Sequence, residues 1–474
     1  MSDLTASLTI TQDRSGTFER AASAKNYFGL VIPTGMITLD TDSKWKTHRR
    51  IMGPAMTSQY LIKSTGHISE SVADLISLWK VKADRAGGRA FDVSKDAENA
   101  SMDTICGMAF GDSWGCNQLS RKQISSGARM SVGETEEAIF HVERPDLANA
   151  MYYLGSSTGY PARQMAAIAH FFIRLTPTYR RHANLLYNEF RRVISQAHQR
   201  AAQTDGDKVS VYQAVNTLDL MVGTGAVGND RLPDNEIRDE LLTYLIAGTE
   251  TTGTALLWWI KLMTRHPELQ VKFREYIRGA LSEEALTSPG WDDLTPNKTP
   301  YLEAMIYETL RYGMIAVFAR RVMRDTVVLG QHIPKGTNII VPTHLGFKEI
   351  PDWQPDRPDK EQQPVGHWAS GSAQCFDPDR WLDADGFFDP NAGPSLPFGS
   401  GVRGCFGKNL ALLELRVFIL QLNRVFFFAS VSEAQNSFKS VESIVRRPTE
   451  AVIRPVAWDS EPAKQALQWS PPVM

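Results

Sequence analysis

Cysteine is scarce in this sequence, and the spacing of the cysteines argues against both a disulfide-bonded scaffold and a structural zinc site. Four cysteines are spread over 474 residues, and no two of them form a CxxC pair. Neither a disulfide scaffold nor a structural zinc site is therefore expected, and a reducing setting that faces the cytosol fits best. The cysteines are Cys106, Cys116, Cys375 and Cys405.

Long apolar runs and an excess of one charge are lacking too. No stretch reaches the roughly 18 apolar residues that a membrane-spanning helix needs, so no transmembrane segment is expected. The N-terminal stretch MSDLTASLTITQDRSGTFER has no apolar core, so it is not predicted to be a signal peptide. The formal net charge of -2 gives no reason to expect nucleic acid as a partner.

The composition that is present, 42% hydrophobic and 22% charged, is typical of one large globular unit. No repeat, low-complexity tract or Gly/Ser linker divides the chain, so residues 1–474 are predicted to form a single domain. Residues 351–375 are polar and rich in Pro and Gly. They are predicted to be a surface loop inserted into that domain.

The spacing of apolar residues predicts a mainly α fold with small β-sheets. Residues 1–40 are expected to be loop with at most one short helix, whereas 96–110 and 165–200 have helical spacing. Another helix is predicted over 301–312, and the run DTVVLGQHIPKGTNIIVPTH after it indicates a small antiparallel sheet. A last helix should follow Cys405, and the C-terminal stretch SVESIVRRPTEAVIRPVAW should form strands and coil.

The strongest predicted helix begins near Asp234, a candidate N-cap, and continues to about Arg265. Pro267 prevents its continuation because proline cannot occupy a helix interior. At 1.5 Å per residue it is roughly 45–50 Å long. Its middle is apolar nearly all round, so we expect it to cross the core as a long central helix.

Cys405 lies in a glycine-rich turn, LPFGSGVRGCFGKNLALLEL, directly before a predicted helix. Glycines let the backbone bend sharply and let a flat cofactor approach closely. The dipole and free N–H groups of a helix N-terminus favour a thiolate, the form of cysteine that binds iron. Arg403 can pair with an acidic group of such a cofactor. The alternative is a turn around a buried structural cysteine.

The long helix carries the run AGTETT, an acid and hydroxyls in an apolar setting where they are costly unless used or paired. Gly248 leaves room for a ligand against the backbone, and Thr251 can bond back to a carbonyl and open the helix locally. An acid, Glu250, and an alcohol beside such a groove suit proton delivery to iron-bound oxygen. The alternative is a buried helix whose Glu and Thr side chains are satisfied internally.

The turn around Cys405 fits the pattern FxxGxRxCxG and resembles the haem-binding signature of the cytochrome P-450 family. The resemblance implies a cytochrome P-450 fold, haem b as cofactor, and Cys405 as the axial ligand of its iron. It also implies that Phe398 and Arg403 bind the cofactor. The matching positions are Phe398, Gly401, Arg403, Cys405 and Gly407.

The AGTETT run resembles the family's A/G-G-x-D/E-T-T/S motif, in which an acid and an alcohol feed protons to the oxygen site. The resemblance implies that Gly248 lies against the cofactor and that Glu250 and Thr251 are catalytic. Here the acid is Glu rather than the commoner Asp.

Two further segments imply partners for the haem propionates. Trp45 and Arg49 in KWKTHRRIMGPAM match the family's WxxxR motif, which contacts one propionate, and the adjacent His48 is a candidate helper. Arg320 in FARRVMRDTVV matches the arginine that reaches the other propionate. Arg321 beside it is the alternative.

A structural triad is implied by two other motifs. Glu308 and Arg311, in YLEAMIYETLRYG, match the family's ExxR pair and share one helix face. Arg380, in FDPDRW, matches the arginine that joins this pair. The resemblance implies a buried structural role for all three residues, and without it such a pair is usually a solvated surface contact.

The resemblance also implies an activity and partners. The expected reaction is NADPH- and O2-dependent monooxygenation, a hydroxylation or epoxidation, of a lipophilic small molecule, with an NADPH–cytochrome reductase docking near Cys405. Lys408 and Arg416 are candidate docking residues. The chain is most similar to fungal microsomal members of secondary metabolism. A monomer at the cytoplasmic face of the endoplasmic reticulum, or in the cytoplasm, is expected, with peripheral membrane contact.

One departure separates the chain from the family's pattern. Only 44 residues precede Trp45, where members have about a hundred. We therefore expect a shortened N-terminus without the anchor and the first strands, which would leave sheet edges exposed. Two alternatives to the monooxygenase stay open: an inactive haem-binding remnant, and a haem-thiolate isomerase or dehydratase that acts on a peroxide.

Overall fold

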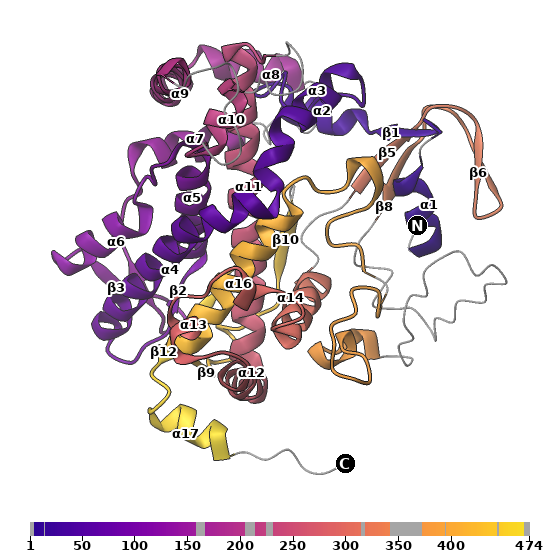
Figure 1. Ribbon diagram of the computed structural model, residues 1–474. Helices are drawn as coiled ribbons and strands as arrows, with labels where there is room; N and C mark the ends of the chain where they lie inside the picture. The colour runs from indigo at the N-terminus through magenta and orange to yellow at the C-terminus, as the bar shows by residue number, and fades with distance from the viewer. Residues whose placement is uncertain are drawn as a thin grey trace.

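The computed structural model describes residues 4–13, 15–157, 166–203, 214–223, 231–313, 318–341, 372–393, 395–442 and 445–468 (Figure 1). The predicted mainly α fold with small sheets is confirmed. The helices are α1 Leu4–Gln12, α2 Ala22–Phe28, α3 Ser43–Met52, α4 Ser58–Ala86, α5 Ser94–Phe110, α6 Cys116–Ser125, α7 Asp146–Ser157, α8 Ala166–Leu175, α9 Pro177–Gln203, α10 Thr217–Gly223, α11 Asp234–Arg265, α12 Pro267–Ala280, α13 Glu283–Thr287, α14 Pro300–Gly313, α16 Lys408–Val425 and α17 Glu461–Gln468.

The strands form small antiparallel or mixed sheets at the edges of the helical body. One sheet has the order β1-β5-β8, another the order β3-β4-β2-β12-β9, and two hairpins are β6-β7 and β10-β11. The strands are β1 Phe18–Arg20, β2 Phe91–Asp92, β3 Met130–Val132, β4 Ala138–Phe140, β5 Phe318–Val322, β6 Thr326–Val328, β7 Gln331–Ile333, β8 Asn338–Val341, β9 Phe427–Ala429, β10 Ser440–Glu442, β11 Arg446–Pro448 and β12 Val452–Val456.

Helix α11 is the predicted central helix, and it runs through the middle of the molecule (Figure 1). Its last residue is Arg265, and Pro267 opens the next helix, as expected. Its first residue differs from the prediction, because Pro233 holds the extended N-cap conformation and Asp234 is already helical. Asp234 is therefore not the N-cap. Helices α5, α14 and α16 pack against α11 and surround it with apolar side chains.

The prediction that residues 1–40 are mostly loop is wrong. They contain α1, β1 and α2, and β1 pairs with β5. Ala6 and Ile10 of α1 lie one turn apart and pack against buried side chains of that sheet. The packing partners are separated from α1 by about 300 residues of sequence, so local spacing could not reveal them.

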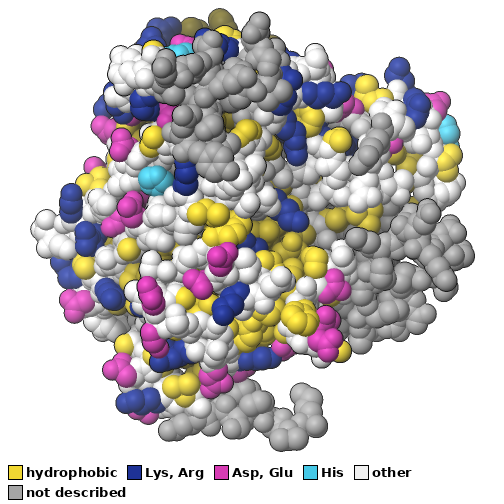
Figure 2. Space-filling model, viewed as in Figure 1, with side chains coloured by type: hydrophobic (Ala, Val, Ile, Leu, Met, Phe, Trp, Pro, Cys, Tyr) yellow, Lys and Arg dark blue, Asp and Glu magenta, His cyan; other side chains and the backbone are white. Residues whose placement is uncertain are grey.

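Other boundaries differ in detail. The helical run predicted over 165–200 consists of α8 and α9, with Thr176 between them and Pro177 opening α9. Helix α17 was not predicted. Most of the loop predicted over 351–375 lies outside the described residues, and its end, Ser372–Gln374, is a turn of 3-10 helix. No described helix is both long enough and apolar enough to span a bilayer. Acidic and basic side chains intermingle over the face drawn in Figure 2.

Candidate active site

A cavity of about 320 Å³ lies between the middle of α11 and the turn that precedes α16. Its lining is largely apolar, with side chains such as Met52, Ile105 and Leu310. All four cysteines lie in the described residues, and of these Cys405 alone lines the cavity. The sequence-predicted residues that share this lining are Trp45, Arg49, Gly248, Thr251, Phe398, Arg403 and Cys405.

The turn around Cys405 is shaped by glycines with positive φ, Gly399 at 63° and Gly401 at 71°. At Gly401 a side chain would collide with the backbone of α1, so the turn needs glycine there for space as well as for conformation. The Cys405 N–H donates to the Phe398 carbonyl at 2.8 Å, which closes the turn. The side chain of Cys405 is accessible because it faces the cavity.

Opposing effects act on the pKa of the Cys405 thiol. Burial raises its pKa, and the Gly407 N–H together with the charges of Arg49 and Lys408 lowers it only in part. A coordinating metal ion would deprotonate the sulfur outright. The turn therefore presents a sulfur whose ionised form depends on a bound cation.

The opposite wall of the cavity is formed by α11. Thr251 Oγ1 donates to the Ala247 carbonyl at 2.7 Å, as expected from the sequence. Gly248 faces Ile105 of α5 so closely that a larger residue would displace that side chain. Thr251 and Gly248 thus lie on the same face as the cavity.

Glu250 lies next to Thr251 in sequence but does not line the cavity. It is half-buried, and burial raises the pKa of its carboxyl, as does the negative charge of Glu98, while Arg447 lowers it. Glu98 forms ion pairs with Arg447 and Arg144. Glu250 therefore faces a charged cluster on the side away from the cavity, and only its neighbour Thr251 faces inward.

Arg20 and Arg403 line one end of the cavity, and Arg320 lies near both of them without lining it. Arg20 and Arg320 are directly opposed on β1 and β5, where two like charges destabilise a strand pair. Arg403 donates to Thr41 Oγ1 at 2.8 Å and to the Leu39 carbonyl at 2.7 Å. Burial, together with the charges of the neighbouring arginines, lowers the pKa of Arg403 and of Arg20 to about 10.

This arginine cluster fits a cofactor that carries two carboxylates. Arg320 Nη2 is buried and has no hydrogen-bond partner among the described residues. Glu19 is the nearby acid, and it lies 3.8 Å from Arg403 while accepting bonds from Thr41 and the Arg20 N–H. One carboxylate cannot satisfy several guanidinium groups, so anionic ligand groups would complete the cluster.

The structure also separates the two adjacent arginines of β5. Arg320 is 6% exposed and points toward Arg20 and Arg403, whereas Arg321 is exposed on the opposite face. On the helix α3, Arg49 stands over the rings of Trp45 and Phe406, with 5.3 Å to each ring centroid. Trp45 also faces Arg403, whose guanidinium is 4.2 Å from its ring centroid.

Comparison with known proteins decides the family. The family model described as Cytochrome P450 matches residues 3–348 and 371–454. The chain belongs to the cytochrome P450 family. It is therefore an oxidoreductase of the P450 monooxygenase type, with a haem whose axial ligand is a cysteine thiolate.

Several named relatives of this P450 come from fungi. The cytochrome P450 monooxygenase GME11363 of Pestalotiopsis microspora is 27% identical, over 96% of this chain and 84% of the relative. The cytochrome P450 monooxygenase TRI13 of Fusarium sporotrichioides is also 27% identical, over 94% of this chain and 83% of the relative. The crystal structure of the cytochrome P450DA haem domain matches with a TM-score of 0.70 and 21% identity, over 96% of this chain and 86% of that one.

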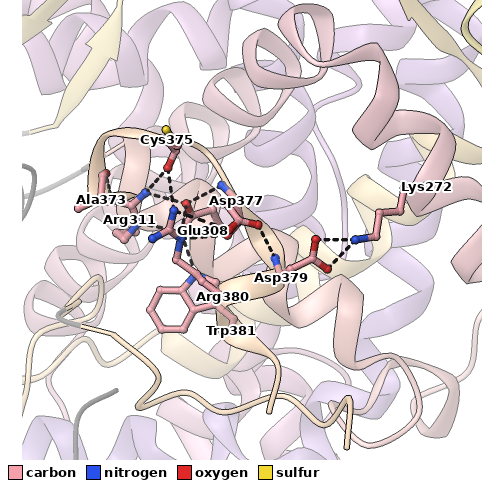
Figure 3. A network of polar contacts seen from close by, with 9 residues as sticks. All are labelled: Lys272, Glu308, Arg311, Ala373, Cys375, Asp377, Asp379, Arg380 and Trp381. Atoms are coloured by element: carbon pink, nitrogen blue, oxygen red, sulfur yellow. Dashed lines mark hydrogen bonds and ion pairs between the residues drawn. The ribbon is translucent and has the colours of Figure 1, made fainter. Parts of the chain in front are cut away.

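The predicted ExxR triad of this P450 is brought together beneath α14 (Figure 3). Arg311 holds Glu308 through bonds of 2.6 and 2.7 Å, and Arg380 approaches the same carboxylate at 3.3 Å. Trp381 Nε1 and the Asp377 N–H also donate to Glu308. All three triad side chains are buried, so the charges are fully paired as the burial of an acid requires.

Two sequence interpretations are wrong in this P450. His48 does not face the cavity beside Trp45 and Arg49 as a direct cofactor contact, because its ring is bonded to Glu236 and Glu240 of α11. Arg416 cannot take part in docking, because it is buried in an ion pair with Glu303. Both roles were predicted from nearby residues in the sequence. The partners of a helical side chain depend instead on the face of the helix on which it lies.

Arg20 and Glu414 are among the cavity residues that the sequence analysis missed. Arg20 lies in a segment predicted as loop, and no local pattern announces its pairing opposite Arg320. Glu414 lines the cavity from α16 and is fully buried, with Ser101 Oγ donating to it at 2.7 Å. A signal for Glu414 did exist, because it is an acid within the apolar run LALLELRVFIL.

Proposed function

We propose that this P450 inserts one atom of O2 into a C–H or C=C bond of a lipophilic small molecule, in the biosynthesis of a fungal secondary metabolite. The observation that carries the proposal is that Cys405 and Thr251 face one apolar cavity from opposite walls. Thr251 supplies an alcohol where the reaction needs a proton, and Cys405 supplies the axial ligand. Likeness to fungal relatives supports the assignment to secondary metabolism.

The bound haem supplies one-electron redox chemistry and the activation of O2. The residues of this chain would hold and orient the cofactor and supply protons to the reaction. Arg49 on α3, together with Arg20, Arg320 and Arg403 at the sheet end, would neutralise the two carboxylates of the cofactor. Trp45 could donate its indole N–H to one of them. The apolar lining keeps bulk water from the reacting atoms, which strengthens each polar interaction that remains.

Protons are proposed to reach Thr251 from the side of Glu250. Burial holds the pKa of Glu250 above its usual value, so this carboxyl takes up a proton more readily than an exposed glutamate does. The paired charges of Glu98, Arg144 and Arg447 connect Glu250 to the protein surface. The back-bond from Thr251 to the Ala247 carbonyl fixes its hydroxyl at the cavity wall.

We propose that an NADPH–cytochrome reductase docks on the face that carries Cys405. Lys408 is exposed at the start of α16, with its ammonium 5.8 Å from the centre of the Phe398 ring. This places a surface cation close to the turn that holds Cys405. A reductase bound there would stand next to the turn that would hold the haem through Cys405.

The chain is proposed to act as a monomeric single domain, residues 1–474, with 351–375 as a surface insertion. The family match omits residues 349–370, which supports an insertion there. We propose peripheral contact with the cytoplasmic face of the endoplasmic reticulum through α8. That helix exposes Ile168, Phe171, Phe172 and Leu175, each at least 47% exposed.

The test begins with the carbon-monoxide difference spectrum of the reduced protein. The wild type should give the band of a thiolate-ligated haem, and Cys405→Ala should lose it. A band at the position of a protonated thiol in the wild type would refute the monooxygenase and favour an inactive remnant.

A second measurement tests the proton path. Thr251→Ala should keep the thiolate band but yield about tenfold less product per NADPH consumed, because the alcohol at the cavity wall is lost. Thr264→Ala is the matched control, because Thr264 makes the same back-bond on α11, to Ile260 at 2.9 Å, away from the cavity lining. Fully coupled turnover in Thr251→Ala would contradict the role of Thr251, and turnover of a hydroperoxide without NADPH would indicate an isomerase.

A further inference from the structure

His48 joins the two helices that form adjacent walls of the cavity. It lies on α3 and is fully buried. Its Nδ1 lies 2.6 Å from Glu240 Oε1, and its Nε2 lies 2.8 Å from Glu236 Oε2. Both glutamates belong to the first two turns of α11, so one imidazole bridges α3 and α11 with both of its nitrogens.

When both glutamates are ionised, the two contacts require a charged imidazole. A carboxylate can only accept hydrogen bonds, so both ring nitrogens must carry a proton for both contacts to form. Burial alone would lower the pKa of His48, but the hydrogen bonds and charges of Glu240 and Glu236 outweigh it and raise the pKa. Glu240 is itself buried, and that burial raises its pKa above the usual value.

The other charged groups around the bridge are already paired. Lys44 Nζ lies 2.7 Å from Glu236 Oε1. Asp239 accepts from the N–H and the hydroxyl of Thr34 and pairs with Arg238. On α10, which packs against α3, Asp219 pairs with Arg200.

Charge balance therefore depends on His48. With Lys44 and His48 protonated and both glutamates ionised, the group is neutral. If the imidazolium of His48 loses one of its two N–H protons, one of the two glutamates loses its hydrogen-bond donor on His48. The partly buried carboxylate of Glu236 keeps Lys44, whereas Glu240 keeps only the Met36 N–H, at 2.7 Å.

The bridge acts on the cofactor end of the cavity through α3. That helix carries Trp45, three residues before His48 in sequence, and Arg49, directly after it, and both line the cavity. Glu240 lines the same cavity from α11. Because α3 is a short helix, a loss of its bond to α11 would free Trp45 and Arg49 to shift together.

We propose that His48, as an imidazolium, is a positioning residue that clamps α3 to α11 and so holds Trp45 and Arg49 in place for the haem carboxylate. This rests on the proposed function. The clamp is intact below the ordinary pKa of histidine and is lost as pH rises through the raised pKa of His48.

The test is the rate of haem transfer from the holoprotein to excess apomyoglobin, measured from roughly pH 6 to pH 9.5. In the wild type the rate should rise about tenfold across a single titration, the effect expected from one lost hydrogen bond to a charged group. His48→Leu should lose haem quickly at every pH. His332→Gln is the control, because His332 is exposed on β7 and should leave the profile unchanged.

Glu240→Gln distinguishes a clamp that depends on the charge of His48 from a His48 side chain that only fills space. The comparison remains valid even if His48→Leu does not fold. A glutamine amide can donate to Nδ1 of a neutral imidazole, while Nε2–H still donates to Glu236. The clamp then no longer needs the charge, so the rise in haem loss at high pH should disappear. A wild-type profile in Glu240→Gln, or a flat profile in the wild type, would overturn the clamp.

The carbon-monoxide spectrum of the same samples keeps the two proposals apart. A wild type without a thiolate band overturns the proposed function and the clamp with it. A wild type with a normal band and a flat pH profile overturns the clamp alone.

Discussion

At the scale of single residues, the arginine cluster shows how little a residue's identity says without its neighbours in space. Arg320 and Arg321 are chemically identical and adjacent, yet strand alternation buries one and exposes the other. Arg320 is opposed to Arg20 across the strand pair, and its Nη2 has no partner among the described residues. The cluster is therefore incomplete without anionic groups.

This incompleteness predicts opposite effects on stability and on cofactor retention. Arg320→Met should leave the free energy of unfolding of the haem-free chain unchanged or raise it by about 1 kcal/mol, because a cross-strand repulsion is removed. The same change should speed haem loss about tenfold, because a charged hydrogen-bond donor is lost. Urea unfolding and haem transfer to apomyoglobin measure the two effects.

Arg321→Met is the matched control on the same strand, and it should alter neither quantity. Equal haem loss in the two variants would contradict the assignment of Arg320 to the cofactor.

Glu414 is the second residue whose behaviour depends on burial. Burial raises its pKa to about 8, although hydrogen bonds from Ser101 and Thr252 lower it. The folded protein therefore holds a proton that the unfolded chain releases above its ordinary pKa of 4.5. The free energy of unfolding should fall as pH rises from about 4.5 to about 8.

Glu414→Gln should remove this contribution, which is on the order of a few kcal/mol. Urea midpoints measured at several pH values across the window should fall less steeply in Glu414→Gln than in the wild type. Glu275→Gln, on the exposed side of α12, should follow the wild type. Parallel curves for Glu414→Gln and the wild type would show that Glu414 ionises normally.

At the scale of elements, the contact between α11 and α5 sets the distal wall of the cavity. A side chain at Gly253 would approach the Cα of Glu98 at 3.2 Å, and backbone cannot move aside as a side chain can. Helix propensity alone predicts that alanine should be better than glycine at this helix position by about 1 kcal/mol. The close approach of the two helices overrides that preference.

Gly253→Ala should therefore fail to stabilise the protein, and we expect a loss of about 1 kcal/mol from overpacking. Gly279→Ala is the matched comparison, because Gly279 lies in α12 with open space around it. It should gain up to about 1 kcal/mol. Thermal unfolding of the two variants measures the difference, and a stabilised Gly253→Ala would show that α5 can move away.

At the scale of the whole molecule, the exposed apolar face of α8 lies far from β3 (Figure 1). Phe171 and Phe172 are 59% and 62% exposed, which is costly in water but favourable at a lipid surface. The combined change Phe171→Glu and Phe172→Glu should lower binding to phosphatidylcholine–phosphatidylserine vesicles about tenfold.

Val132→Glu is the control for this surface, because Val132 is an exposed apolar residue of β3. Vesicle sedimentation measures binding, and the carbon-monoxide spectrum shows that each variant retains its haem site. Equal binding by both variants would exclude α8 as the contact.

Most of the helical body could be predicted from the sequence because its signals are local. The limits of α11 follow from apolar spacing and from Pro267, and the ExxR pair follows from the one-turn separation of Glu308 and Arg311. The N-terminal part could not be predicted in this way. Its short helices and β1 depend on contacts with β5, about 300 residues away.

The sequence by itself determined the chemistry that this chain can perform. The relevant patterns are local and can be recognised without the structure. They are Cys405 in its glycine turn, the Glu250–Thr251 pair and the motif arginines. Only the tertiary structure decided which of these groups meet. It turned Glu250 and His48 away from the cavity, buried Arg416, and brought Arg20 opposite Arg320. The physical reason is that the direction of a side chain depends on the packing of its helix or strand against distant partners.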